Sequence, residues 1–231
     1  MFLQQRSYQK ELLDGDHIPF QDIKKNMEEL DAINTLLGGH AITVKGFASL
    51  AGNKKNITVC EMGCGGGDNL VAIARWCERN NIQVNCIGID LKKECIEVAS
   101  KQKFLQGIAT WIASDYVEVK FDTKPDIIFS SLFCHHFTDI ELINQLQWMQ
   151  VNSGAGFFIN DLHRHWAAYY SIRVLTKIFS TSYLVKNDAP LSVARGFLKT
   201  EWAALCAKAG IRHPSIQWKW AFRHLIIAQH E

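Results

Sequence analysis

The hydrophobic pattern of this chain changes its period near residue 57. Before that point apolar side chains recur at spacings of three, four or seven residues, which predicts an amphipathic helix. That series is Phe20, Ile23, Met27, Leu30 and Leu37, and Gly38-Gly39 follows it as a helix stop. Beyond residue 57, short apolar runs predict five strands, at residues 57–60, 84–89, 109–113, 126–130 and 156–159.

Helical patterns separate these strands, at residues 70–77, 96–99 and 142–149. Strands that alternate with helices are typical of a parallel sheet with helices on both faces, so we expect an α/β, Rossmann-like fold. After the fifth strand the rhythm breaks, and we expect a helix over 166–178 and a loop around Asp188-Ala189-Pro190.

The end of the chain predicts one more helix and a pair of strands. The helix covers Trp202 to Ala209 and stops at Gly210. The strands, at about 211–219 and 221–229, have too short a connection for a helical crossover, so they should pair antiparallel. We therefore expect a single domain with four parts: an N-terminal helical cap (1–56), a core (57–161), a helical substrate lid (162–198), and a C-terminal helix and hairpin (199–231).

Composition limits the partners of the protein. The 231 residues carry a net charge of only +2, and no basic run or RNA-binding module is visible, so no nucleic-acid partner is expected. The seven cysteines are odd in number and lack a C-x-x-C pair, which favours a reducing, cytoplasmic compartment over a disulfide framework. Neither a signal peptide nor a membrane span is expected, because no run of about 18 apolar residues occurs. A monomer or a homodimer is expected.

The strongest chemical signal is the glycine loop Gly63-Cys64-Gly65-Gly66-Gly67, which follows a strand and opens a helix. Glycines there allow positive φ angles and let a ligand lie against bare backbone. The dinucleotide fingerprint G-x-G-x-x-G does not fit, because its last position falls on Asp68 or Leu70. An acid at that helix start disfavours a pyrophosphate and favours a cationic ligand such as S-adenosylmethionine (SAM), which carries a sulfonium and an ammonium.

Polar residues follow the next three strands of the predicted sheet. Asp90 ends the second strand, where a carboxylate can accept both ribose hydroxyls. Asp115 comes after the third, where it can accept from an adenine amino group while Tyr116 stacks on the ring. Ser130-Ser131 ends the fourth, facing the amino-acid end of the ligand. Any one of these features alone is a common turn or helix cap, but four at successive strand ends indicate a SAM site.

Residues 57–161 resemble the class I SAM-dependent methyltransferases, in the broad group that includes ubiquinone and menaquinone biosynthesis enzymes. The resemblance implies a sheet of order 3-2-1-4-5-7-6 with the last strand antiparallel. Leu37-Gly38-Gly39 and the stretch from Asn160-Asp161-Leu162-His163-Arg164 to Pro190-Leu191-Ser192 resemble a subgroup found near polyketide-type pathways. The expected cofactor-binding residues are Glu61, Gly63, Cys64, Gly65, Gly67, Asn69, Asp90, Leu91, Ser114, Asp115, Tyr116, Ser130 and Ser131.

Histidines after the fourth and fifth strands are the candidate general bases. Of the pairs His135-His136 and His163-x-His165, we predict that His135 or His163 touches the acceptor. No metal is predicted, because adjacent histidines often point apart. Arg195 is expected to be solvated. Aromatic residues at helical spacing in the lid either line a flat or lipid-like substrate or, more often, pack in the core: Trp166, Tyr169, Tyr170 and Phe179.

The function predicted from these features is methyl transfer from SAM to a small molecule. The expected acceptor is an oxygen, or a carbon, of a phenolic, polyketide or quinone-like compound. The asparagine-proline-proline-tyrosine type of motif for amino-group methylation is absent, and Ser130-Ser131-Leu132-Phe133 stands in its place. Two alternatives stay open: an enzyme directed at RNA or protein, and a non-catalytic SAM-binding protein.

Overall fold

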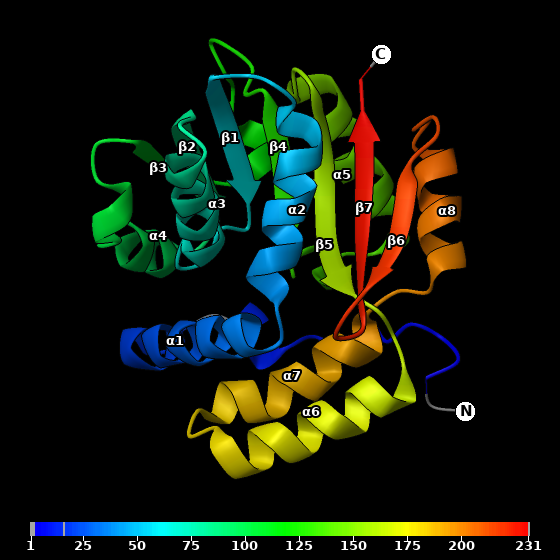
Figure 1. The fold of residues 1–231 in the computed structure, drawn as a ribbon. Coiled ribbons are helices and arrows are strands. Elements are labelled where there is room, and N and C mark those ends of the chain that lie inside the picture. Colours follow the sequence, from blue (N-terminus) through cyan, green and yellow to red (C-terminus); the bar gives the residue numbers. More distant parts are fainter. Residues whose placement is uncertain (1–2, 16, 231) are drawn as a thin grey trace.

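Seven strands form one sheet in the order β3-β2-β1-β4-β5-β7-β6 (Figure 1). The structure is a computed structural model that describes residues 3–15 and 17–230; residues 1, 2 and 16 of the predicted cap and residue 231 of the predicted C-terminal part lie outside it. The strands are β1 (Asn56–Met62), β2 (Gln83–Asp90), β3 (Ala109–Ala113), β4 (Ile127–Ser131), β5 (Gly156–Leu162), β6 (Ser215–Lys219) and β7 (Arg223–Gln229).

The sheet confirms the expected topology. β1 pairs parallel with both β2 and β4, and β7 pairs antiparallel with β5 and β6. The chain therefore leaves β1 toward β2 and β3 on one side and returns on the other side as β4. In such sheets ligands bind where the strand order reverses, at the carboxyl ends of the strands, and here that point lies between β1 and β4.

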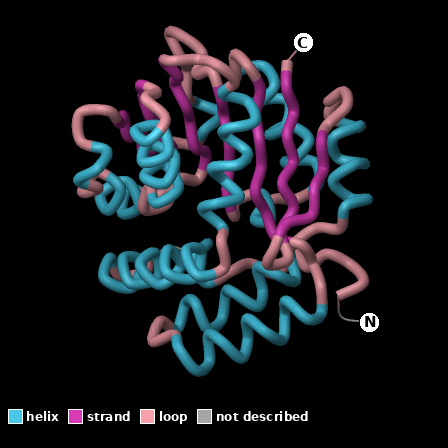
Figure 2. Tube along the Cα trace, in the orientation of Figure 1, coloured by secondary structure: helices cyan, strands magenta, loops and turns pink. Residues whose placement is uncertain are grey.

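Helices cover both faces of the sheet and the carboxyl ends of its parallel strands. In Figures 1 and 2, α1, α6 and α7 lie across the end where β1 and β5 terminate, whereas α2 and α3 cover one face. The helices are α1 (Phe20–Leu36), α2 (Gly39–Ala51), α3 (Asp68–Arg79), α4 (Lys93–Ala99), α5 (Asp139–Asn152), α6 (Trp166–Phe179), α7 (Tyr183–Arg195) and α8 (Lys199–Lys208). Short 3-10 turns are η1 (Leu12–Asp14), η2 (Lys103–Leu105), η3 (Tyr116–Glu118) and η4 (Cys134–His136).

Two hydrophobic clusters, one on each face, hold the sheet between its helices. On the α2 and α3 side, the rings of Phe129 and Phe158 stack at 4.8 Å, and Phe47 lies in the same cluster. On the α5 and α8 side, Trp202 packs against Phe197 at 4.2 Å. All five side chains are fully buried, so these contacts fix the strand ends that carry the site.

Two helices differ from the sequence prediction. α2 was not predicted, because its glycines obscure the helical pattern; Gly46 is nevertheless required, since an added Cβ would lie 2.5 Å from the Phe158 ring. The predicted loop around Asp188-Ala189-Pro190 is wrong, because α7 continues through Pro190. The carboxylate of Asp188 accepts from the amides of Leu12 and Leu13 at 2.8 and 2.9 Å, and this contact helps to offset the hydrogen bond that the proline lacks.

None of the helices within residues 3–15 and 17–230 has the length and apolar composition that a bilayer-spanning segment requires. All seven cysteines are buried and free, so none of them takes part in a disulfide.

Candidate functional site

The glycine loop connects β1 to α3 by way of three left-handed residues. Gly63, Gly65 and Gly67 have φ angles of 65°, 50° and 77°, which side chains other than glycine rarely adopt. A Cβ on Gly63 would lie 2.2 Å from the ring of Phe133, so the loop passes directly beneath that ring. A Cβ on Gly65 would meet nothing within 4 Å, because this residue faces open space. The middle of the loop is therefore the bare backbone of a cavity wall.

Asp90 ties the end of β2 to this loop. Its Oδ2 accepts from the amide of Gly65 at 2.9 Å, and its Oδ1 accepts from the amide of Lys92 at 2.9 Å. Burial raises the pKa of the carboxyl, although the two amides oppose that rise. Each carboxylate oxygen has a second lone pair, so Asp90 keeps the capacity to accept from ligand hydroxyls.

Glu61 lies behind the loop with one oxygen unused. The side chain is fully buried, and its Oε1 accepts from Asn69 Nδ2 at 3.0 Å. Its Oε2 has no hydrogen-bond partner among the residues that the structure describes. Burial raises the pKa of Glu61 well above its usual range. An unsatisfied buried carboxylate oxygen is costly, and a cationic ligand beside the loop would offset that cost, so the residues fit SAM.

The ends of β3 and β4 close the same region. Asp115 caps the turn η3 by accepting from the amide of Val117 at 3.1 Å, and Tyr116 packs edge-on against Trp148 with 5.3 Å between centroids. Ser130 is buried, with its Oγ 3.3 Å from Cys134 Sγ. Ser131 Oγ accepts from Asn160 Nδ2 at 3.4 Å.

The predicted cofactor residues divide into those that line a cavity and those behind it. One cavity, of about 590 Å³, is lined by Gly63, Cys64, Gly65, Asn69, Asp90, Leu91 and Ser131 among others. An adjoining cavity of about 550 Å³ adds Ser114, Asp115 and Tyr116. Glu61, Gly67 and Ser130 line neither. We call these two spaces together the donor cavity.

A second, largely apolar cavity of about 340 Å³ lies between α1, α6 and α7; we call it the acceptor cavity. It shares a wall with the donor cavity, formed by Leu13, Leu30, Asn34, Leu132 and His136. Leu132 has a φ of 52° directly after β4, a strained conformation for a leucine. The strain occurs at the point where the two cavities meet.

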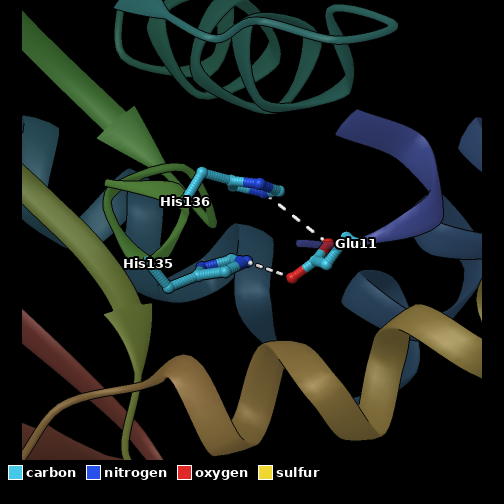
Figure 3. A group of neighbouring side chains, drawn as sticks. All are labelled: Glu11, His135 and His136. Atoms are coloured by element: carbon cyan, nitrogen blue, oxygen red, sulfur yellow. Dashed lines mark ion pairs between the residues drawn. The ribbon is translucent and has the colours of Figure 1, made fainter. Parts of the chain in front are cut away.

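His135 occupies a polar corner of the acceptor cavity. Its Nδ1 lies 2.8 Å from Asp161 Oδ1. On the other side of the ring, its Nε2 lies 3.5 Å from Glu11 Oε1 (Figure 3). All three side chains are buried. Burial alone would lower the pKa of His135, but the carboxylate of Asp161, together with that of Glu11, outweighs it and raises this pKa to about 9.

His136 and Arg195 extend the corner. His136 Nδ1 lies 2.8 Å from Asp14 Oδ1, and its Nε2 lies 3.8 Å from Glu11 Oε2. The solvated position expected for Arg195 is wrong. Its guanidinium is buried, donates to the His135 carbonyl at 2.9 Å and pairs with Asp14 at 3.3 Å. These contacts explain the burial, because the arginine compensates carboxylates that other segments bring together.

His163 and the aromatic residues of the lid do not line the acceptor cavity. His163 Nδ1 accepts from the indole of Trp218 at 3.1 Å, and the residue lines neither cavity. Trp166, Tyr170 and Phe179 are more than half exposed, so their predicted place in the core is wrong. The lid contributes its aliphatic residues to the acceptor cavity instead, namely Ile172 and Leu175, together with Ala168 and Ser171.

Sequence reasoning missed the N-terminal strap, which we define as residues 3–15. The amide of Ser7 donates to the Ala194 carbonyl at 3.0 Å, and Arg6 donates to the carbonyl of Phe137 and pairs with Asp139 at 2.8 Å. The strap thereby carries Glu11 and Asp14 to the histidines. Nothing in the hydrophobic pattern marks these two acids, because they lie more than a hundred residues from their partners in the chain.

Comparisons with known proteins agree with this geometry. The profile of a family described as Methyltransferase domain matches residues 53–199, more than half of the chain. No curated protein sequence matches at a significant level.

The solved structures that resemble this chain share its fold at low sequence identity. The plantazolicin methyltransferase BpumL in complex with S-adenosylhomocysteine (SAH) has a TM-score of 0.67 at 17% identity, covering 91% of this chain and 90% of that one. Magnesium protoporphyrin IX methyltransferase from Synechocystis PCC 6803 has a TM-score of 0.56 at 13% identity, covering 94% and 90%. A candidate O-methyltransferase from Nostoc punctiforme PCC 73102 has 0.61 at 16%, covering 87% of this chain, which spans only 59% of that protein.

The narrower resemblances to quinone-biosynthesis and polyketide-associated enzymes stay predictions.

The family match, the sheet order 3-2-1-4-5-7-6 and the glycine loop at the carboxyl end of β1 agree with one another. The chain belongs to the methyltransferase domain family and has the fold of the class I SAM-dependent methyltransferases.

Proposed function

We propose that this protein transfers a methyl group from SAM to an oxygen of a small molecule with an apolar body. The observation that carries the proposal is that the donor and acceptor cavities adjoin at Leu132 and His136, which line both spaces. A methyl group can pass between two ligands only where both meet without intervening protein or water. Small acceptors are also named for similar structures, such as magnesium protoporphyrin IX and N-acetylserotonin.

The donor cavity has suitable groups for each part of SAM. Asp90 would accept from the ribose hydroxyls, and Asp115 and Tyr116 lie where the adenine is expected. The backbone at Gly65 would lie against the amino-acid part, with the buried carboxyl group of Glu61 behind it. Bound SAM supplies a methyl group that is already activated by its sulfonium. The remaining task of the protein is therefore to place the acceptor and to stabilise the loss of its proton.

The acceptor cavity supports a substrate with one polar end. Its walls are largely aliphatic, including Leu30, Ile33, Leu162, Ile172 and Leu175, and its polar corner holds Glu11 and His135. A phenol or enol would direct its hydroxyl toward that corner and its apolar body toward the walls. Of the two histidines predicted to touch the acceptor, we keep His135 and not His163, because only His135 lines the cavity.

Calorimetric titration with SAM and SAH tests the donor half. We expect both to bind wild-type protein, and we expect Asp90→Ala to lose about 1.5–3 kcal/mol of affinity, the range for hydrogen bonds to a charged group. The exposed Asp122→Ala is the matched control and should bind normally. Absence of binding in wild type would contradict the proposal.

Mass-spectrometric detection of methylation on a panel of alkyl-substituted phenols and enols tests the acceptor half. We expect O-methylated products and no transfer to RNA or to unfolded protein substrates. Tight SAH binding with no turnover on the whole panel would favour a non-catalytic SAM-binding protein. Transfer to RNA alone would favour the nucleic-acid alternative.

A further inference from the structure

Three side chains from two distant segments direct their ligand atoms at one point of the acceptor cavity. Figure 3 shows the imidazoles of His135 and His136 pointing toward opposite oxygens of Glu11. The Nε2 atoms lie 3.5 and 3.8 Å from the carboxylate, and one ligand atom from each residue falls within 4.8 Å of the other two. Adjacent histidines often point apart, so this convergence is specific to the turn η4.

A second carboxylate orients each imidazole from behind. Asp161 holds Nδ1 of His135, and Asp14 holds Nδ1 of His136, each at 2.8 Å. A carboxylate that holds Nδ1 leaves Nε2 as the ring atom directed at Glu11, and a metal ion bound there would take the place of the Nε2 proton. In metal sites a carboxylate commonly lies behind a histidine that binds the ion. This carboxylate fixes the tautomer and the orientation of the ring.

The carboxylates of this corner suit a cation between the three ligand groups. Glu11, Asp14 and Asp161 are the carboxylates that face the imidazoles, whereas Arg195 pairs with Asp14 and Arg223 acts on Asp161. Arg6 also acts on Asp161. A divalent ion that takes the place of the Nε2 protons would keep a positive charge among these carboxylates.

We propose that Glu11, His135 and His136 bind a divalent transition-metal ion of the Zn²⁺ class. Two imidazole nitrogens and one carboxylate are ligands that Zn²⁺ and related ions accept, and they leave coordination positions free. All three residues line the acceptor cavity, so the free positions face the substrate space. If the proposed function holds, the ion would bind the deprotonated oxygen of the acceptor. Only this role of the ion rests on the proposed function; the binding site itself does not.

A second group of possible ligands provides the matched control. Asp31, His40 and Asp68 also bring their ligand atoms together, but Asp31 is exposed and the group contains a single imidazole. His40 Nδ1 lies 3.4 Å from Thr35 Oγ1, so no carboxylate orients the ring from behind. This group resembles a surface ion-pair network more than a metal site.

The test is a Zn²⁺ titration of the untagged, chelator-treated protein of residues 1–231 by calorimetry, with metal content measured after gel filtration. We expect one tightly bound Zn²⁺ per chain. His136→Gln should abolish it, and Asp14→Asn should weaken it by about 10- to 100-fold, as loss of a second-layer carboxylate does. His40→Gln should bind like wild type. Absence of saturable Zn²⁺ binding in wild type, or loss of it in His40→Gln alone, would overturn the inference.

SAH titrations on the same metal-free samples separate this inference from the proposed function. SAH binding without Zn²⁺ binding would overturn the metal site and leave the methyltransferase proposal intact. Zn²⁺ binding without SAH binding would overturn the methyltransferase proposal and leave the metal site intact. Circular dichroism checks that each variant is folded. If His136→Gln does not fold, Asp14→Asn is the decisive variant, because Asp14 is only half-buried.

Discussion

The imidazole of His135 lies 2.8 Å from the carboxylate of Asp161, and both side chains are buried in the protein. Asp161 also accepts from the amide of His135 at 3.2 Å and from its own neighbour Leu162 at 2.7 Å. One carboxylate at the end of β5 thus fixes both the ring and the backbone of the turn after β4. The geometry of the acceptor corner depends on this link.

We predict that Asp161→Asn destabilises the protein by about 3–5 kcal/mol, the usual cost of removing one partner of a buried charge pair. The amide nitrogen of asparagine cannot accept from the backbone, and the His135 ring loses its counter-charge. Urea unfolding monitored by circular dichroism measures the change. The control is Asp126→Asn, whose carboxylate pairs with the half-exposed Lys54. A loss below about 1 kcal/mol in Asp161→Asn would contradict this account.

Alanine substitutions at two glycines can separate the effect of backbone strain on stability from the effect of ligand contact on SAH binding. Gly65 and Gly107 have φ angles of 50° and 80°, and neither has an atom within 4 Å of an added Cβ. Alanine at either position should cost about 1 kcal/mol of stability through the left-handed backbone alone. Only Gly65 lines the donor cavity, so Gly65→Ala should also weaken SAH binding by at least about tenfold, equivalent to about 1.4 kcal/mol. Equal SAH affinity in the two variants would contradict the assignment of the loop.

His224 should make the protein less stable in mild acid. Burial, reinforced by the nearby His163 ring, lowers the pKa of this β7 residue to about 4. The unfolded chain binds a proton near pH 6.5, before the folded protein does, so stability falls as the pH drops from about 6.5 to 4. A shift of this size corresponds to about 3 kcal/mol at pH 4.

The measurement is the free energy of unfolding at pH 7.5, 6 and 5 for wild type and His224→Gln. The glutamine variant should lose less stability over this interval, because it does not titrate. Parallel curves for the two proteins would show that His224 is not the group responsible.

The sheet could be predicted because its signals are local. Apolar runs of strand length specify β1 to β5, and a helical pattern follows each of them except β3. The short connection before Arg223 specifies the antiparallel pair. α2 escaped prediction because its Gly46 serves a contact with Phe158 that only the folded chain creates. α7 escaped because Pro190 is a strong local breaker, whereas the contacts of Asp188 that help to hold the helix come from the N-terminal strap.

The two halves of the site differ in the same way. The donor residues follow strand ends that the topology must bring together, so Gly65 and Asp90 could be placed from spacing alone. Glu11 reaches His135 only because the strap crosses the carboxyl ends of the sheet, and no periodicity encodes that path. The exposure of Trp166 likewise depends on which face of α6 packs against α7, and the helical spacing of the aromatic residues leaves this open.

The apolar walls predict how the enzyme selects its acceptor. The acceptor cavity continues into a groove of about 400 Å³ between α1 and α6, and Leu175 lines both spaces. Leu175→Gln should raise KM about 5- to 30-fold for phenols with a long alkyl chain, because an amide without a partner costs about 1–2 kcal/mol against an apolar ligand. Phenols without the chain should be unaffected. The control is the neighbouring Val174→Gln, which lines neither space. An equal rise in KM for both variants, or for both kinds of phenol, would mean that the alkyl chain of the acceptor does not lie in this groove.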